Sequence, residues 1–297
     1  MVNFREKMLS FRHLCYKNGY LFAAFLIPVI LMGIAYISFG IYPFGGRSVL
    51  SLDLNAQYVF YFDYVHDVIG NGESLMYSWS RNLSGEFMGI IGYYLASPFN
   101  ILVWIFPRSM ITEGLLTMML AKFGACGVTF ALFAHKSQKL SKTTAALFAP
   151  MYALCAYMIV QTMDPMWLDG LIYLPLICWG VHRLVDEGKL VPYIVPLALM
   201  FIAHFYIGYM VGIFTFFYFC WYCLSREGRI LPKKFFSRCV AFGIGTLVAL
   251  MCAAFVLITV YNSLKLGKFE FTDPDFSLAT QFDFLTFITK LFPMSYD

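Results

Sequence analysis

The sequence predicts an all-α polytopic membrane protein with about seven transmembrane helices. Of its 297 residues, 60% are hydrophobic and only 13% are charged, whereas a soluble domain has about 25% charged residues. Aromatic residues reach 19%, and the basic residues cluster beside apolar runs, as positions next to a membrane require. The net charge of +4 is too small to indicate binding of nucleic acid. The composition therefore indicates a chain that crosses a lipid bilayer several times.

The first apolar run, residues 20–42, follows four basic residues, which are Arg5, Lys7, Arg12 and Lys17. The run is too long for the core of a cleaved signal peptide, so we interpret it as a retained membrane anchor. The positive-inside rule places the amino terminus in the cytoplasm. The segment after this span then lies on the outer face of a bacterial cell membrane.

Residues 88–106 are apolar enough to cross the membrane, but they contain the sequence ASPFN and end at Pro107. If they crossed, the lysine cluster at residues 136–142 would lie outside, against the positive-inside rule. We therefore predict that residues 88–106 form an interfacial or re-entrant element. Residues 43–109 then make up one outer loop.

The later apolar runs are predicted to cross in alternating directions, at residues 110–134, 143–162, 168–184, 190–224 and 239–261. The run at 190–224 is nearly twice the roughly 20 residues that one span needs. We therefore expect two short spans that meet at a hinge near the sequence AHFYIGY. We interpret residues 1–297 as a single transmembrane domain and as the amino-terminal part of a longer protein.

The outer loop holds the main catalytic candidate, Asp53, close to the end of the first span. Helical periodicity over residues 54–69 predicts an amphipathic helix that lies on the bilayer. Its apolar face would carry Leu54, Tyr58, Tyr61, Val65 and Val68. We interpret Asp63 and Asp67 as acids of the solvated face, while Asp53 is either another such acid or a catalytic carboxylate.

A second polar group, Arg81 and Glu86, lies in the sequence YSWSRNLSGEFMG of the same loop. With Trp79 it would contact a sugar by stacking and hydrogen bonding, and the alternative is an ordinary turn. The eight cysteines lie mostly within apolar runs, so we interpret them as small apolar side chains. The sequence contains no Walker motif and no Ser, His and Asp set, and we predict neither a metal ion nor a cofactor.

Two further residues lie at membrane depth. Lys122 is near the middle of its span, where a charge costs about 3 kcal/mol and needs a partner or a cavity. Asp169, one turn into the span after the sequence DPMW, is a possible partner. His204, at the predicted hinge, is either a proton relay or a hydrogen-bonded packing residue.

Several motifs together resemble the YfhO family of bacterial multipass membrane proteins. They are DLNAQY, YSWSRNLSGEFMG, YYLASPFNIL, MWLDGLIYLPLICWGVHRLVDEG and AHFYIGYMVGIFTFFYF, in this order along almost the entire chain. The resemblance implies the GT-C glycosyltransferase architecture, with transfer of a sugar from a polyprenyl-phosphate carrier to a cell-envelope acceptor. It implies Asp53 as the general base, and family links point to teichoic-acid glycosylation. Arg81 or Lys122 would hold the leaving phosphate, and membrane lipids would surround the site.

Two other classes of protein fit parts of the sequence. A transporter or lipid flippase would use the broken segment near His204 and the buried Lys122. A non-catalytic membrane scaffold would use neither of these features. The polar residues gather in one outer loop and not at the membrane midplane, which favours the glycosyltransferase.

Overall fold

Long helices make up most of the computed structural model, which describes residues 2–80, 85–225, 232–267 and 288–289. The chain divides into two units, Met1–Ser263 and Leu264–Asp297, and the description below concerns the first unit. Five helices carry segments long and apolar enough to cross a membrane: α1 (Val2–Ser38), α5 (Ile111–Lys136), α8 (Asp169–Glu187), α10 (Phe205–Leu224) and α11 (Pro232–Gly267). Up to seven spans result if two bent helix pairs are counted as well. The prediction of an all-α polytopic membrane protein is confirmed.

The first bent pair covers the predicted re-entrant element. Helix α3 (Met88–Ile90) continues into η2 (Ile91–Leu95), and η3 (Pro98–Asn100) continues into α4 (Ile101–Ile105), with a bend of 91° between the two halves. Ser97 makes the corner by accepting a hydrogen bond from the N–H of Phe99 before Pro98 fixes the next turn.

Contacts on both sides of this element show where the chain goes. Arg108 at the start of η4 (Arg108–Met110) follows the element, and it forms an ion pair with Asp63, which precedes it. The chain therefore enters and leaves this element at the same end of the helix bundle. This geometry agrees with a re-entrant element and not with a span.

The second bent pair, α6 (Lys142–Ala153) with α7 (Ala156–Val160) and η5 (Gln161–Met163), turns by 48° after Ala153. It corresponds to the predicted span at residues 143–162. Helix α6 begins at Ser141, whose side chain accepts a hydrogen bond from the N–H of Thr144. The next turn, η6 (Pro165–Leu168), leads directly into α8.

The long apolar run at 190–224 is broken into a helical hairpin. Helix α9 (Val191–Ala203) ends at His204, whose backbone is extended, and α10 then runs back along α9. Gly208 of α10 lies against the side chain and backbone of Phe201, where a larger residue would not fit. The predicted hinge is confirmed, although α9 has 13 residues and is shorter than an ordinary span.

The outer loop begins with a π-helix, η1 (Leu54–Tyr58), and continues as α2 (Val59–Asn71). A short hairpin follows, in which β1 (Tyr77–Ser78) pairs with β2 (Gly85–Glu86). The buried face of η1 and α2 consists of Leu54, Tyr58, Phe62, Val65 and Val68, so Phe62 replaces the expected Tyr61. The sequence predicted that this face rests on the bilayer. In the structure it belongs to a protein core with Val103 of α4 and Leu115, Met118 and Met119 of α5.

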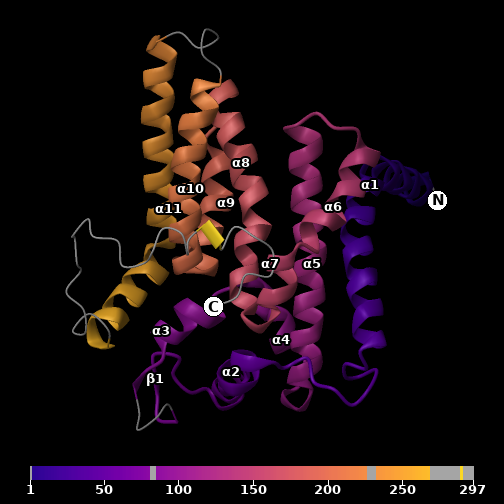
Figure 1. Cartoon of the computed structure of the whole chain (residues 1–297), viewed down its shortest axis with the longest axis vertical. Coiled ribbons are helices and arrows are strands. Elements are labelled where there is room, and N and C mark those ends of the chain that lie inside the picture. The colour runs from indigo at the N-terminus through magenta and orange to yellow at the C-terminus, as the bar shows by residue number, and fades with distance from the viewer. Residues whose placement is uncertain (1, 81–84, 226–231, 268–287, 290–297) are drawn as a thin grey trace. The chain divides into compact units, whose positions relative to one another are not determined.

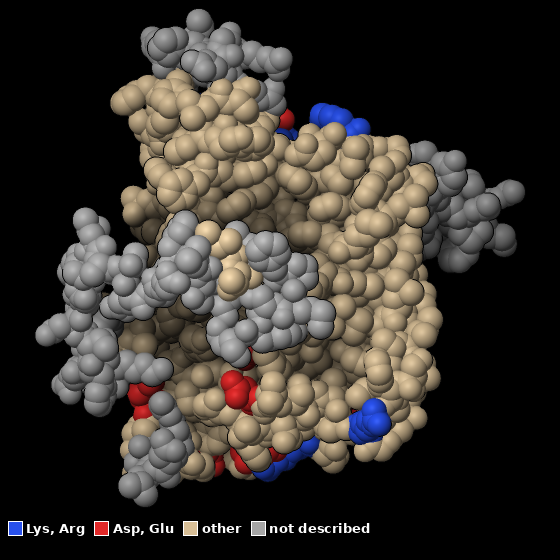
Figure 2. Space-filling model, viewed as in Figure 1, with Lys and Arg blue, Asp and Glu red and all other residues tan. Residues whose placement is uncertain are grey.

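The helix ends gather at two opposite ends of the bundle (Figure 1). One end holds the α5–α6 and α8–α9 turns, and we call it the basic end because Lys136, Lys142, Arg183, Lys189 and Arg238 lie there or nearby. The other end holds α2, α3, α4 and β1, and we call it the acidic end. In Figure 2 most of the visible acidic atoms, together with some basic ones, lie at that end, while the visible helix flanks between the two ends are almost uncharged. This distribution is typical of helices that cross a bilayer.

Candidate functional site

Asp53 lies at the acidic end, between two unusual backbone segments. The residue before it, Leu52, has a φ of 46°, a conformation that is strained for a bulky side chain. The residues after it, Leu54–Tyr58, form the π-helix η1, a rare element that is frequent at functional sites. The side chain of Asp53 is exposed. The accessible carboxylate of Asp53 therefore lies directly after a costly backbone conformation at Leu52, and such strain is a feature of functional sites.

Asp53 shares a hydrogen-bond partner with a second, buried acid. The hydroxyl of Tyr58 lies 2.9 Å from Oδ1 of Asp164 and 3.3 Å from Oδ2 of Asp53. Tyr58 and Asp164 are 6% and 5% exposed, respectively, whereas Asp53 is open to solvent. Because a phenol carries a single proton, the two carboxylates compete for it. The pair thus combines one accessible and one enclosed carboxyl group.

Burial is the main cause of the shifted pKa values of Asp164 and Tyr58. Burial raises the pKa of the Asp164 carboxyl above its ordinary value of 3.8, while the hydrogen bond from Tyr58 lowers it and the charge of Asp53 raises it. Burial also raises the pKa of the Tyr58 phenol, and the hydrogen bond to Asp164 adds to this effect. Tyr58 therefore remains a neutral donor at physiological pH. Asp164 holds a proton more readily than an exposed aspartate would.

A buried ion pair fixes the turn that carries Asp164. Nζ of Lys122 lies 2.5 Å from Oδ2 of Asp169 and 2.7 Å from the carbonyl oxygen of Pro165, the residue after Asp164. The hydroxyl of Ser97 donates to Oδ1 of Asp169 at 3.0 Å. Asp169, which the sequence indicated as a possible partner of Lys122, is therefore its partner in the structure. Both side chains are 0% exposed, so their contact with a substrate stays a prediction.

An aromatic wall connects this acid pair with the helix break. The ring of Tyr94 lies 4.9 Å from that of Tyr58 and 5.0 Å from that of Tyr61, and its neighbour Tyr93 lies 4.6 Å from His204. His204 is fully buried, and its Nδ1 accepts a hydrogen bond from the N–H of Ile207 at the start of α10. This contact caps the helix and supports the packing interpretation of His204.

The second predicted polar group is only partly described. Glu86 accepts hydrogen bonds from the N–H of Gly89 at 2.9 Å and from the hydroxyl of Ser263 at 2.5 Å. These contacts connect the hairpin with the re-entrant element and with α11. Arg81 lies outside the described residues, and a contact of either side chain with sugar stays a prediction.

Asp63 and Asp67 are not merely solvated acids. Arg108 lies 2.6 Å from Oδ1 and 2.7 Å from Oδ2 of Asp63, and it also pairs with Asp67. Two parallel contacts to one carboxylate fix the geometry more strongly than a single contact does. The three side chains therefore hold α2 against the turn before α5.

Sequence reasoning missed three participants: Tyr58 and Asp164 as a linked pair, and Arg108. The sequence DPMWLD carried a signal for Asp164, because an acid before proline in an apolar region needs a buried partner. Arg108 gave no signal, since it stands 45 residues from Asp63. Among the described residues, no three His, Cys, Asp or Glu side chains form a group that could hold a metal ion.

Fold and site together define a polytopic α-helical membrane protein with a cluster of acids and tyrosines at one end of its helices. The sequence pattern of the family described as Bacterial membrane protein YfhO matches residues 23–297. The chain therefore belongs to the YfhO family. No curated protein and no solved structure gives a match.

Proposed function

We propose that the protein is a membrane glycosyltransferase of the GT-C type. It takes a sugar from a polyprenyl-phosphate carrier and passes it to an acceptor outside the cytoplasm, such as a cell-wall polymer. The single observation that carries this proposal is the placement of Asp53. Its exposed carboxylate lies in a strained segment beside the buried Tyr58–Asp164 pair, in the loop where the resemblance to this class expects the base.

The proposed step is an inverting displacement. An acceptor hydroxyl within about 3 Å of Asp53 gives its proton to the carboxylate while its oxygen attacks the anomeric carbon. The bond between that carbon and the phosphate oxygen breaks, and polyprenyl phosphate leaves with the bonding electron pair. No covalent enzyme intermediate forms. Arg81 is our candidate for binding the leaving phosphate, because Lys122 is enclosed and paired with Asp169.

Asp164 and Tyr58 support this step without meeting the acceptor. The Tyr58 hydroxyl donates more closely to Asp164, at 2.9 Å, than to Asp53, at 3.3 Å. Asp53 therefore keeps lone pairs free for the acceptor proton. The buried pair holds the Asp53 side chain in place, which is the contribution expected of a positioning group.

The test is a transfer assay with the purified protein in lipid nanodiscs. The donor is a polyprenyl-phosphate sugar with a radiolabel in the sugar, and the acceptor is extracted cell-wall polymer. We expect the label to move from the lipid to the polymer in the presence of the protein, and not with empty nanodiscs. Absence of transfer from every donor and acceptor tried would argue against a glycosyltransferase.

A transporter or lipid flippase is the second candidate, and one observation favours it. The helix break carries a fully buried polar side chain, His204, whose Nε2 has no partner among the described residues. Broken helices with polar groups at membrane depth are typical of transport sites. A fluorescent polyprenyl-phosphate lipid that crosses the bilayer of proteoliposomes, without any sugar transfer, would support this candidate.

A further inference from the structure

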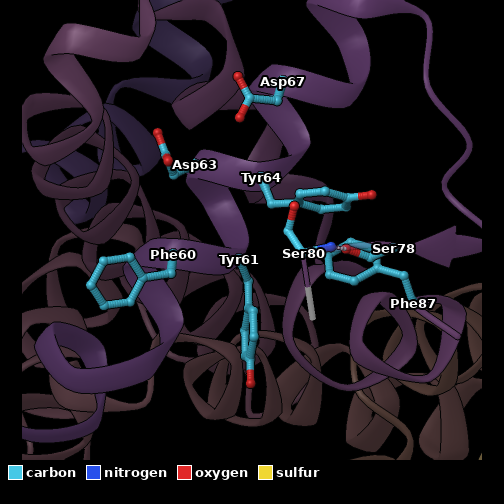
Figure 3. A pocket seen from close by; sticks show the side chains of 8 residues that line it. All are labelled: Phe60, Tyr61, Asp63, Tyr64, Asp67, Ser78, Ser80 and Phe87. Carbon is cyan, nitrogen blue, oxygen red and sulfur yellow. Dashed lines mark hydrogen bonds between the residues drawn. The ribbon is translucent and has the colours of Figure 1, made fainter. Parts of the chain in front are cut away.

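A pocket of about 230 Å³ lies between α2 and the β1–β2 hairpin, in the outer loop that also carries Asp53. Figure 3 shows the side chains that line it: Phe60, Tyr61, Asp63, Tyr64, Asp67, Ser78, Ser80 and Phe87. Phe87 and Ser78 are 2% and 1% exposed and are the most enclosed of these residues. Its walls are half-buried tyrosines and aspartates of α2. We propose that this pocket binds one neutral pyranose ring of a carbohydrate.

The aromatic side of the pocket suits the apolar face of a sugar ring. The rings of Tyr64 and Phe87 lie 4.6 Å apart at 65°, and those of Tyr61 and Phe87 lie 6.5 Å apart at 74°. In such edge-to-face pairs the rings do not stack on one another, so a ring face stays free for a third group. The axial C–H groups of a pyranose carry partial positive charge and pack against the negative face of an aromatic ring.

The polar side of the pocket suits the hydroxyl groups of the same ring. A carboxylate offers about four lone-pair directions, and among the described residues the contacts of Asp63 and Asp67 with Arg108 take up only some of them. Arg108 fixes both side chains before any ligand arrives, which lowers the entropic cost of binding. Ser78 and Ser80 add hydroxyl groups at the opposite wall.

Arg108 also weakens the attraction of the pocket for a cationic ligand. An aromatic pocket with two free carboxylates would attract an ammonium group. Here one guanidinium lies against both carboxylates and offsets one of their two charges, so an added cation gains less and meets a like charge nearby. A neutral polyol avoids this repulsion. The volume is also below the roughly 300 to 1,000 Å³ of sites for drug-sized ligands, which suits a single ring.

The position of the pocket gives the bound ring a role, which rests on the proposed function. Tyr61 follows Asp53 by eight residues, about 12 Å along a helix, and Tyr94 contacts both Tyr58 and Tyr61. A ring in the pocket is therefore separate from the sugar that reacts at Asp53. It is a neighbouring unit of the acceptor chain, and the pocket sets the distance between that unit and the hydroxyl that reacts.

The experiment is saturation-transfer-difference NMR on the whole protein in nanodiscs. The ligands are methyl hexopyranosides, with tetramethylammonium as the cationic comparison. Wild type should saturate the ring protons of at least one hexoside, and Tyr64→Leu and Asp67→Asn should each lower this signal about tenfold. Tyr209→Leu removes an exposed tyrosine from α10 and is the matched control, with an unchanged signal. Elution of each variant at the wild-type volume shows that it is folded.

The inference would be overturned by the absence of a hexoside signal in wild type, or by a signal that Tyr64→Leu and Asp67→Asn leave unchanged. Preference for tetramethylammonium would also overturn it. Asp53→Asn separates this inference from the proposed function. This variant should keep the NMR signal of the hexoside but lose sugar transfer. A signal with the expected variant pattern but without any transfer supports the pocket and removes only the glycosyltransferase. Displacement by the polyprenyl-phosphate sugar, but not by the acceptor polymer, would assign the ring to the donor instead.

Discussion

Two aspartates that share one tyrosine hydroxyl differ mainly in their surroundings. Asp53 faces solvent, where its carboxylate is accessible to a substrate. Asp164 is enclosed at 5% exposure, where burial favours its neutral form. Active sites often separate the roles of two acids in this way, through environment and not through residue type. In the proposed function, Asp53 therefore takes the proton of the acceptor and Asp164 has the supporting role.

Asp53→Asn tests this assignment in the transfer assay. The amide keeps the size of the side chain but cannot take the acceptor proton, so we expect a rate loss of about 10² to 10⁴. The matched control is Glu73→Gln in the same loop, an exposed acid outside the site, which should stay within about twofold of wild type. Wild-type activity in Asp53→Asn would end its assignment as the base. Poor accumulation of the variant would show that Asp53 is structural instead.

Asp164→Asn tests the electrostatics through the pH dependence of thermal stability. The folded pKa of Asp164 is raised, so its contribution to wild-type stability is complete below the unfolded value near 3.8. This contribution is lost as pH rises through the folded pKa. Asparagine does not titrate. We therefore expect the unfolding midpoint of Asp164→Asn to rise relative to wild type as pH increases from about 4.

Tyr58→Phe gives an independent check on the same titration. The hydrogen bond from Tyr58 lowers the pKa of Asp164, so its removal should raise that pKa further. The pH range over which stability falls should then move upward relative to wild type. Midpoints measured from pH 4 to 8 in detergent would show the shift. Parallel curves for wild type, Asp164→Asn and Tyr58→Phe would contradict a raised pKa at Asp164.

At the scale of helices, the Lys122–Asp169 pair connects α5 with α8 and with the turn before it. Lys122 of α5 contacts Asp169 of α8 and the carbonyl oxygen of Pro165 in η6, and Asp169 also accepts a hydrogen bond from Ser97 in the re-entrant element. These three contacts join four segments of the chain. A buried ion pair of this kind contributes little net free energy compared with apolar residues, but the loss of one partner strands the other charge. The pair therefore specifies how these segments meet.

Lys122→Met should destabilise the protein by about 3 to 5 kcal/mol, because Asp169 remains buried without its cation. The double variant Lys122→Met with Asp169→Leu should recover most of this loss. Lys189→Met is the control, since it breaks an exposed pair with Glu187 and should cost about 0 to 1 kcal/mol. Thermal unfolding in detergent measures all three. Equal midpoints for Lys122→Met and Lys189→Met would show that the buried pair is not needed.

The helices were predictable from the sequence wherever an apolar run had the length of a span, and so was the break at His204. The pairing of Lys122 with Asp169 was predictable too, because a charge at membrane depth must find a partner. The surroundings of α2 were not predictable. An apolar helix face looks the same in sequence whether it meets lipid or protein, and here Phe62 and Val65 pack on other helices.

The candidate site was predictable only at Asp53, and the rest of it depends on long-range contacts. Tyr58 meets Asp164 across 106 positions of sequence, and Arg108 meets Asp63 across 45. No local pattern of charge or hydropathy in the sequence predicts such long-range contacts. These contacts form because the re-entrant element and the turn before α8 bring distant segments of the chain together at the acidic end.

At the scale of the whole first unit, the loops separate into two sets. The ring of Tyr20, near the start of the first span, lies 5.2 Å from that of His135 at the end of α5, and Tyr222 of α10 donates to Asp186 of α8. These contacts collect the lysine-rich turns at the basic end. The acids of the outer loop and Asp164 share the acidic end. We propose, from the positive-inside rule, that the basic end lies in the cytoplasm.

Cysteine labelling in intact cells tests this orientation. In a background without the native cysteines, Asn71→Cys at the acidic end should react with a membrane-impermeant maleimide. Gln138→Cys, in the exposed α5–α6 turn at the basic end, should react only after the cells are permeabilised. The reverse pattern would place Asp53 in the cytoplasm, where an acceptor outside the cell could not reach it. Labelling of both residues from outside would contradict the re-entrant assignment of residues 88–106, because one more crossing between Asn71 and α5 would move the α5–α6 turn to the outer face.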